Sequence, residues 1–326
     1  MNRGEGRLRL PLGPPLPRGE RRRDRTWRSK GPRVSERIGF VGVGAMGEPM
    51  ARAILRAGHH VCASVHRSRE RLERLLVDGV EEASTPAEVA KRSNVVITCV
   101  PDAPQVEEAL FGADGAAAGA AHGTLFIDMS TISPVASRGF EQRLSALGCA
   151  FVDAPVSGGP ARAATGTLAI MAGASDADFA RAEPILAAMG TPHHVGGVGM
   201  GETVKLVNQI LISSIMVANV EALTFARKAG ADLDAVRKVI ASATGSNYLL
   251  EQWLPKTWLG GTFEGGFAMD LLRKDLGASL DAARAMKMPM PATAFAYQMY
   301  TAQSARGDGA LDYSAIAKLY EQLAGD

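Results

Sequence analysis

Short apolar runs alternate with helical stretches between Arg37 and about Gly197, and this alternation constrains the fold more than any other feature. The apolar runs, each predicted as a strand, are 38–41, 61–65, 94–100, 124–128, 150–153 and 167–171. Helical patterns occur among them at 46–57, 68–77 and 134–147. Strands that alternate with helices build a parallel sheet covered on both faces. We therefore expect an α/β fold with a Rossmann-type doubly wound sheet.

After Gly201 the strand patterns stop and the chain becomes helical. The first helix is predicted from Glu202 to Gly230, about 40 Å at ~1.5 Å per residue and long enough to bridge two domains. Further helices are predicted at 233–241, 269–286, 291–305 and 313–323. The expected organisation is a disordered basic tail (1–35), a dinucleotide-binding domain (36–197) and an all-helical C-terminal domain for substrate binding and dimerisation (198–326).

The uncharged run 206–220 is the one stretch that resembles a membrane span. It is shorter than the ~20 residues that a span needs, and Asn, Gln and Ser interrupt it. We therefore expect a helix buried on most faces inside a soluble protein with no membrane partner.

The charge of the chain is divided unevenly. Residues 1–34 carry eleven Lys or Arg and three Asp or Glu, whereas the rest of the chain has a net charge of −6. This balance excludes a basic nucleic-acid-binding domain in the body. The tail resembles a mispredicted start or a dispensable extension more than a transit peptide. A tail that tethers nucleic acid is the remaining alternative, and deleting residues 1–34 would test it.

The cysteines and histidines indicate the compartment and argue against a metal. Cys62, Cys99 and Cys149 are few, odd in number and far apart, which is typical of reduced thiols in a cytoplasmic protein. The six histidines form no recognisable ligand spacing, so no protein-bound metal is expected.

A glycine motif follows the first predicted strand and opens the first helix. Gly42, Gly44 and Gly47 form G-x-G-x-x-G. In a dinucleotide site the first glycine permits a tight turn, the second lets the backbone approach the pyrophosphate, and the third lets the helix pack closely. The phosphates then bind at the positive end of the helix.

The end of the second predicted strand distinguishes the two nicotinamide cofactors. An NAD site usually has a carboxylate there for the ribose hydroxyl. This strand ends instead in His66, Arg67 and Ser68. Arg67 and Ser68 suit a 2′-phosphate, although Arg67 could also belong to an ordinary surface turn. NADP(H) is therefore preferred, with NAD(H) as the alternative.

Three later segments could supply a proton donor and a substrate anchor. They are the strand end 153–159, which contains Ser157, Gly158 and Gly159; the stretch 197–208, which places Lys205 and Asn208 on one helix face; and Arg273 to Leu276. Taken singly, each segment also fits a structural role as a turn, a solvated charge or a surface ion pair.

Together with the glycine motif, these segments resemble the β-hydroxyacid dehydrogenase family, also called the 3-hydroxyisobutyrate dehydrogenase family. The likeness runs in order from about Arg37 to Glu321 and includes the run Ile-Asp-Met-Ser-Thr-Ile-Ser-Pro at 127–134. It implies a reductase that interconverts a small semialdehyde acid and its hydroxy acid, such as those acting on 2-hydroxy-3-oxopropionate, 3-hydroxyisobutyrate, or glyoxylate and succinic semialdehyde. Segment 267–276 looks nearest to the first of these types. The resemblance also implies homodimers or homotetramers packed through the helical domain.

The resemblance assigns roles to individual residues. Lys205 would be the catalytic lysine, with Asn208 orienting it and the substrate. The substrate carboxylate would lie at Ser157, Gly158 and Gly159, assisted by Ser130. Cofactor-binding residues would be Gly42, Gly44, Met46, Gly47, Arg67, Ser68, Val100, Pro101, Thr131 and Lys274. Family members that use NADP usually have Asn where this chain has His66, so the NADP prediction depends on Arg67 and Ser68.

Two rival functions remain open on the sequence alone. The chain could be a non-catalytic module that binds a dinucleotide, or an enzyme similar to the imine reductases. Both kinds of relative typically lack the lysine, so Lys205 argues against them.

Overall fold

A computed structural model describes residues 35–64, 69–264 and 266–325 of the chain. The described residues belong to one compact unit, and Met1–Val34 lie outside the described residues. The predicted tail therefore stays a prediction.

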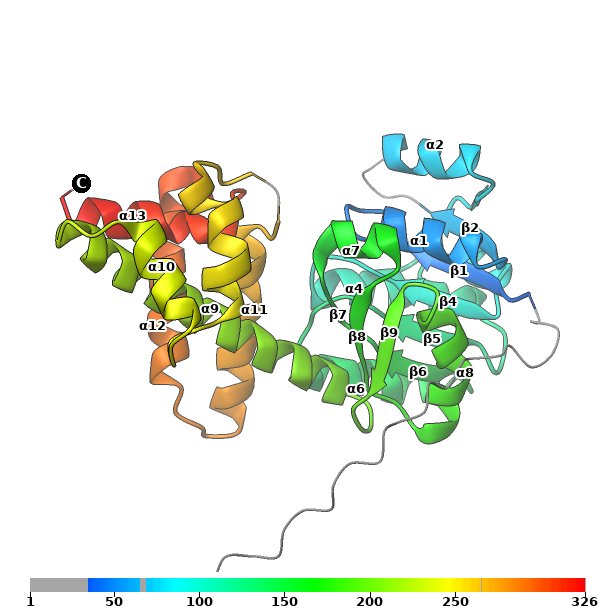
Figure 1. Cartoon of the computed structure of the whole chain (residues 1–326). Helices are drawn as coiled ribbons and strands as arrows, with labels where there is room; N and C mark the ends of the chain where they lie inside the picture. Colours follow the sequence, from blue (N-terminus) through cyan, green and yellow to red (C-terminus); the bar gives the residue numbers. More distant parts are fainter. Residues whose placement is uncertain (1–34, 65–68, 265, 326) are drawn as a thin grey trace, which may run out of the picture. The chain divides into compact units, whose positions relative to one another are not determined.

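The larger sheet has six parallel strands in the order β3-β2-β1-β4-β5-β6 (Figure 1). Its strands are β1 (Arg37–Val41), β2 (His60–Ser64), β3 (Glu81–Glu82), β4 (Val95–Thr98), β5 (Leu125–Asp128) and β6 (Ala150–Asp153). The helices between them are α1 (Gly47–Arg56), α2 (Arg69–Val77), α3 (Pro86–Lys91), α4 (Ala103–Phe111), α5 (Ala116–Gly119) and α6 (Pro134–Ser145). The predicted doubly wound sheet is confirmed.

Helices cover both faces of this sheet. Because successive side chains of each strand point to opposite faces, they enter two different cores. Ile38 and Phe40 of β1 lie in one buried cluster, and Val41 lies in the other. Likewise Ile97 of β4 belongs to the first cluster and Val96 to the second. This double burial explains why the strands are continuous apolar runs.

A second, three-stranded sheet follows, which the sequence did not predict. It consists of β7 (Val156–Ser157), β8 (Leu168–Ala172) and β9 (Gly190–His194), with α7 (Gly159–Thr165) and α8 (Asp176–Leu186) between them. The run 167–171 was expected in the parallel sheet, but β8 pairs antiparallel with β7 and parallel with β9. Strand β7 has only two residues, and β9 contains Pro192 and two histidines, so neither has an apolar pattern in the sequence. The two-residue strand β3 of the larger sheet was missed for the same reason as β7.

The remaining chain is helical, as predicted. Its elements are α9 (Met200–Lys228), α10 (Leu233–Ala241), the short helices η1 (Leu249–Trp253), η2 (Leu254–Lys256) and η3 (Trp258–Gly260), α11 (Met269–Ala285), α12 (Pro291–Gln303), η4 (Ser304–Asp308), η5 (Tyr313–Ala315) and α13 (Ile316–Leu323). Helix α9 contacts α11, α12 and α13 along one part, and α6, β6 and β8 along another (Figure 1). It therefore packs against both the sheets and the C-terminal helical region.

Helix α9 is less buried than expected. Among the described helices it is the one long and apolar enough to cross a membrane by length and composition, and 39% of its most apolar window is buried. The prediction that it would be buried on most faces is wrong, because Val207 is 49% and Leu211 54% exposed. Its packed face carries Met216 and Val220, which join the core of the helical domain.

Candidate active site

The glycine turn lies between β1 and α1, and its three glycines have different surroundings. Gly42 has φ +104°, and a Cβ there would lie 2.3 Å from the carbonyl oxygen of Cys99. A Cβ on Gly47 would lie 2.1 Å from the carbonyl oxygen of Gly42. A Cβ on Gly44 would meet nothing within 4 Å. The turn is therefore tightly packed at Gly42 and Gly47 and open at Gly44, which is the arrangement that a pyrophosphate needs. Met46 is the N-cap residue of α1 beside this opening.

The residues predicted to select the cofactor, Arg67 and Ser68, lie outside the described residues. The neighbouring arginines of α2, Arg71 and Arg74, form ion pairs with Glu48 in the first turn of α1. Their hydrogen bonds, first that of Arg74, lower the pKa of Glu48 to about 2. These two arginines therefore already have a carboxylate partner.

Lys274 joins the loops that follow β4 and β5. Its Nζ donates hydrogen bonds to the carbonyl oxygens of Pro101, at 2.9 Å, and of Thr131. The Oγ of Ser130 accepts a hydrogen bond from the Val100 N–H at 3.0 Å. The structure thus brings together Val100, Pro101, Ser130, Thr131 and Lys274, although they come from three separate parts of the chain.

Lys205 lies in the second turn of α9 and is 7% exposed. Burial lowers the pKa of its ammonium below the ordinary value of 10.5, and Asp275 and Glu202 partly oppose this shift. The Nζ lies 5.9 Å from the centroid of the Phe267 ring. Within the described part of the chain, no hydrogen-bond acceptor is found for this Nζ. Lys205 is thus a buried amine that faces an aromatic ring and has a lowered pKa.

Gln209 and Asp275 lie close to Lys205, and the sequence assigned neither of them a role, although Asp275 belongs to the candidate segment 273–276. Asn208 donates a hydrogen bond to Gln209 at 3.0 Å, and Gln209 donates one to Asp275 at 2.7 Å. Asp275 also forms an ion pair with Lys274 at 3.0 Å. Asn208 was expected to orient Lys205, but its side-chain hydrogen bond goes to Gln209. Gln209 and Asp275 are almost fully buried. Because Gln209 lies on α9 and Asp275 on α11, their hydrogen bond joins the two helices.

Three buried carboxyl groups lie at the start of α9, and the sequence assigned none of them a role, although two belong to the motifs at 127–134 and 153–159. Asp128 and Asp153 end the neighbouring strands β5 and β6 in register, and Glu202 lies in the first turn of α9. Asp153 accepts hydrogen bonds from the backbone N–H groups of Gly199, at 2.7 Å, and Glu202, at 2.8 Å. Burial raises the pKa of Asp153 to about 6 and that of Glu202 further above its ordinary value. Asp153 thereby fixes the start of the helix that carries Lys205. Carboxylates at two adjacent strand ends are the signal that could have found this pair.

The segment Ser157–Gly159 ends β7 and begins α7. Gly158 has φ +134° and Gly159 has φ +69°, so both adopt conformations that favour glycine. A Cβ on Gly158 would lie 2.6 Å from Cδ of Arg162, whose side chain packs over this turn. The hydrogen bonds of the described residues do not connect this segment directly to Lys205 or Ser130. The segment is positioned by β8, because Ser157 pairs antiparallel with Ala169.

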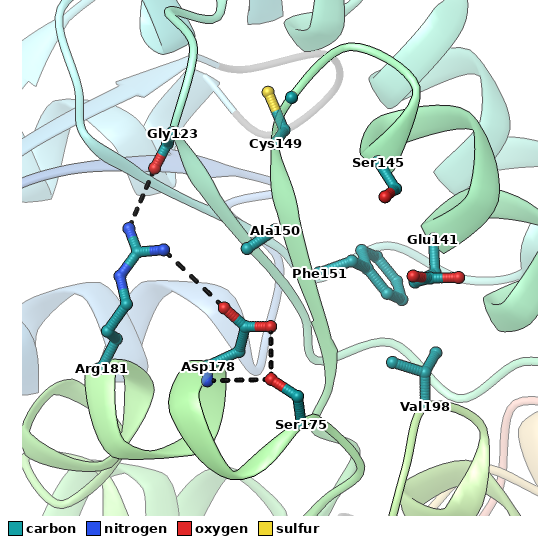
Figure 2. A pocket seen from close by; sticks show the side chains of 11 residues that line it. Gly123, Glu141, Ser145, Cys149, Ala150, Phe151, Ser175, Asp178, Arg181 and Val198 are labelled. Carbon is teal, nitrogen blue, oxygen red and sulfur yellow. Dashed lines mark hydrogen bonds and ion pairs between the residues drawn. The ribbon is translucent and has the colours of Figure 1, made fainter.

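A separate pocket of about 260 Å³ lies beside β6 and contains none of the predicted site residues (Figure 2). Arg181 on its wall donates a hydrogen bond to the carbonyl oxygen of Gly123 and forms an ion pair with Asp178. Asp178 in turn accepts a hydrogen bond from Ser175. These three polar side chains of the pocket wall therefore satisfy one another. Among the described residues there is also no group of three side chains that could hold a metal ion.

Two family models match this chain. The NAD binding domain of 6-phosphogluconate dehydrogenase matches residues 37–201. The NAD-binding domain of NADP-dependent 3-hydroxyisobutyrate dehydrogenase matches residues 199–320. Both models describe nicotinamide-dinucleotide enzymes, and between them they cover both sheets and the helical domain.

Individual relatives agree with these family models. The chain is 37% identical to 2-(hydroxymethyl)glutarate dehydrogenase of Eubacterium barkeri, over 89% of this chain and 97% of that protein. It is 38% identical to 2-hydroxy-3-oxopropionate reductase of Escherichia coli, over 88% and 98%. A solved structure of 3-hydroxyisobutyrate dehydrogenase of Mycobacterium tuberculosis with L-serine is 31% identical, with a TM-score of 0.82 over 88% of this chain and 99% of that one. The chain therefore belongs to the β-hydroxyacid dehydrogenase family and is an NAD(P)-dependent oxidoreductase of hydroxy acids and their semialdehydes.

Proposed function

We propose that this enzyme reduces a short semialdehyde that carries a carboxylate, with NADP(H) as the preferred cofactor and Lys205 as the proton donor. The observation that carries the proposal is the buried Lys205 Nζ, which has a lowered pKa and no hydrogen-bond acceptor in the described part of the chain. A general acid must be free to reach the substrate oxygen, and its pKa should be near the working pH.

In the reductive direction, the ammonium of Lys205 donates a proton to the carbonyl oxygen of the substrate. When bound, the nicotinamide supplies the hydride for the carbonyl carbon, or accepts it in the reverse direction. In the oxidative direction, neutral Lys205 accepts the hydroxyl proton. Because burial disfavours the charged ammonium, the lysine loses its proton more easily than one in water.

The substrate carboxylate is proposed to bind at Ser157, Gly158 and Gly159, with Ser130 beside it. Two successive glycines with positive φ expose backbone N–H groups that can hold an anion. Ser130 is only 3% exposed and accepts a hydrogen bond from Val100, which fixes its hydroxyl near the ends of β4 and β5.

The cofactor is proposed to bind across the glycine turn at Gly42, Gly44, Met46 and Gly47, with Val100, Pro101 and Thr131 near the nicotinamide. The open face of Gly44 supports this placement of the pyrophosphate. Lys274 then acts by holding the loops at Pro101 and Thr131 in place. The preference for NADP(H) rests on Arg67 and Ser68 in the sequence.

Oxidation of NADPH and NADH by the purified enzyme tests this proposal, with 2-hydroxy-3-oxopropionate, methylmalonate semialdehyde, succinic semialdehyde and glyoxylate at matched concentrations. We expect 2-hydroxy-3-oxopropionate to be the best of the four, since segment 267–276 looks nearest to reductases of that type. We also expect a preference for NADPH that Arg67→Ala reduces by at least about tenfold, as for loss of a charge-assisted contact to phosphate. Faster turnover with NADH would reject the 2′-phosphate interpretation, and no turnover of any aldehyde would reject the reductase.

For the oligomer, we propose that the exposed apolar face of α9 packs against a second copy of this chain. Met200, Val204, Val207 and Leu211 are spaced by four, three and four residues and are 38–54% exposed. This is the spacing of a helix–helix seam.

We also propose that the enzyme is cytoplasmic, since its three cysteines are free thiols.

A charged residue within this seam is expected to disrupt the oligomer. Val207→Glu places an unpaired carboxylate at the centre of the proposed interface, so the mass in solution should fall to that of the monomer. Light scattering after size exclusion measures this mass. Val77→Glu is the matched control, because Val77 is 88% exposed on α2 and lies outside the seam. An unchanged mass for Val207→Glu would remove α9 from the interface.

A further inference from the structure

Asp312 lies in the loop before η5 and is only 1% exposed. Its side chain accepts three hydrogen bonds. Its Oδ1 accepts from the indole Nε1 of Trp253 at 3.1 Å and from the backbone N–H of Ser314 at 3.0 Å. Its Oδ2 accepts from the backbone N–H of Phe267 at 3.0 Å. A single buried carboxylate thus connects η1, η5 and the segment that precedes α11.

Backbone hydrogen bonds reinforce this connection. The N–H of Asp312 donates to the carbonyl oxygen of Phe263, and the N–H of Tyr313 donates to that of Phe267, both at 2.9 Å. Gly266 lies between these two contacts with φ +75°. A Cβ at this position would lie 2.2 Å from Asp312 Oδ2, so the backbone passes the carboxylate at a distance that only glycine allows.

The segment held in this way presents the Phe267 ring to Lys205. The Lys205 Nζ lies 5.9 Å from the ring centroid, within the range of a cation–π interaction. The ring also makes an edge contact with Tyr313, with centroids 6.2 Å apart. Tyr313 in turn contacts Trp253, a hydrogen-bond partner of Asp312. Asp312 and the aromatic rings therefore fix one position for Phe267.

We infer that Asp312 is a positioning residue that holds the Phe267 ring against Lys205 and so sets how far the lysine amine is open to molecules in the site. This inference rests on the proposed role of Lys205. Asp312 itself contacts neither substrate nor cofactor; it acts through the backbone of Phe267. The ring is the apolar wall beside the amine, and its displacement would admit water to a buried group.

The direct test is the variant Asp312→Asn. Both carboxylate oxygens of Asp312 now accept hydrogen bonds. In the asparagine variant an N–H₂ group replaces one of these oxygens and cannot accept, so at least one donor loses its partner. We expect kcat/KM for the best aldehyde to fall by about tenfold, because the Phe267 ring is no longer held in one position beside Lys205. Asp308→Asn is the matched control, because Asp308 accepts from Gln303 and Lys318 in the same domain, away from Lys205.

A double-mutant cycle with Phe267→Leu separates positioning from a general loss of structure. If Asp312 acts through Phe267, the double variant should be no worse than the poorer single variant. If the two losses multiply, the inference is wrong. Should Asp312→Asn fail to fold, Gly266→Ala replaces it in the cycle, because its Cβ would push Asp312 Oδ2 away from the segment.

A second measurement does not depend on turnover. Trace acetylation of Lys205 by acetic anhydride, followed by peptide mass spectrometry, reports how open the amine is when it is carried out at a pH above the pKa of this lysine in every variant, where the amine is neutral throughout. We expect labelling to rise about threefold or more in Asp312→Asn and in Phe267→Leu, as the wall beside a buried amine is lost, and to stay unchanged in Asp308→Asn. Equal labelling in Asp312→Asn and wild type overturns the inference even if turnover falls. Failure of the proposed function would appear separately, as no turnover by the wild-type enzyme.

Discussion

Replacing Lys205 with alanine is expected to remove nearly all turnover while leaving the cofactor bound. The lysine is buried, and its Nζ has no hydrogen-bond acceptor among the described residues, so the fold loses no hydrogen bond when the amine is removed. A general acid contributes about 10²–10⁴-fold to a rate, and we expect a loss of that size in kcat. Steady-state kinetics measure kcat, and NADPH fluorescence titration measures cofactor binding.

Lys238→Ala is the matched control for this variant, because Lys238 is exposed on α10, outside the proposed site. Its kcat should equal that of the wild-type enzyme. A Lys205→Ala enzyme that keeps turnover within about tenfold of wild type would remove Lys205 from the proton-transfer role. A parallel loss of NADPH binding would assign the lysine to cofactor binding.

The glycine turn provides the second large effect, because its glycines should respond differently to alanine. At Gly44 the added Cβ meets nothing within 4 Å, and the backbone needs no positive φ, so the fold should be unaffected. A pyrophosphate at this face would meet the new methyl group. We therefore expect Gly44→Ala to weaken NADPH binding at least about tenfold without a change in melting temperature.

Gly42→Ala is the contrasting variant. Its Cβ would lie 2.3 Å from the Cys99 carbonyl oxygen, at a φ of +104°. We expect the free energy of unfolding to fall by about 2–4 kcal/mol from overpacking and backbone strain. Calorimetry and NADPH titration of both variants distinguish the two effects. If Gly44→Ala binds NADPH as tightly as wild type, the pyrophosphate does not lie at the glycine turn.

The sequence predicted the elements that have strong periodic patterns. The parallel strands β1, β2, β4, β5 and β6 and the helices α9 to α13 were predicted because each carries an apolar pattern of sufficient length. The small sheet was missed because β7 has two residues, and because β9 is polar and contains Pro192. The exposed face of α9 was also missed, since hydrophobicity alone does not tell which apolar side chains find a partner within one chain.

The motifs led to Lys205, Lys274 and the glycine turn, because the chemistry of these residues is tied to short spacings. The contacts that position them join distant parts of the chain and leave no local pattern. Asp312 accepts from Phe267 across 45 residues, and Gln209 donates to Asp275 across 66. Such contacts arise only when the helices pack, so a structure was needed to find them.

The central claim, that the Lys205 amine exchanges the proton, is tested most directly by the pH dependence of kcat in both directions. Reduction requires the ammonium, so its kcat should fall as the pH rises through the pKa of Lys205. Oxidation requires the neutral amine, so its kcat should rise over the same interval. Because burial lowers this pKa, both transitions should have their midpoint below the ordinary value of 10.5. Two rates that remain independent of pH throughout that interval would contradict the claim.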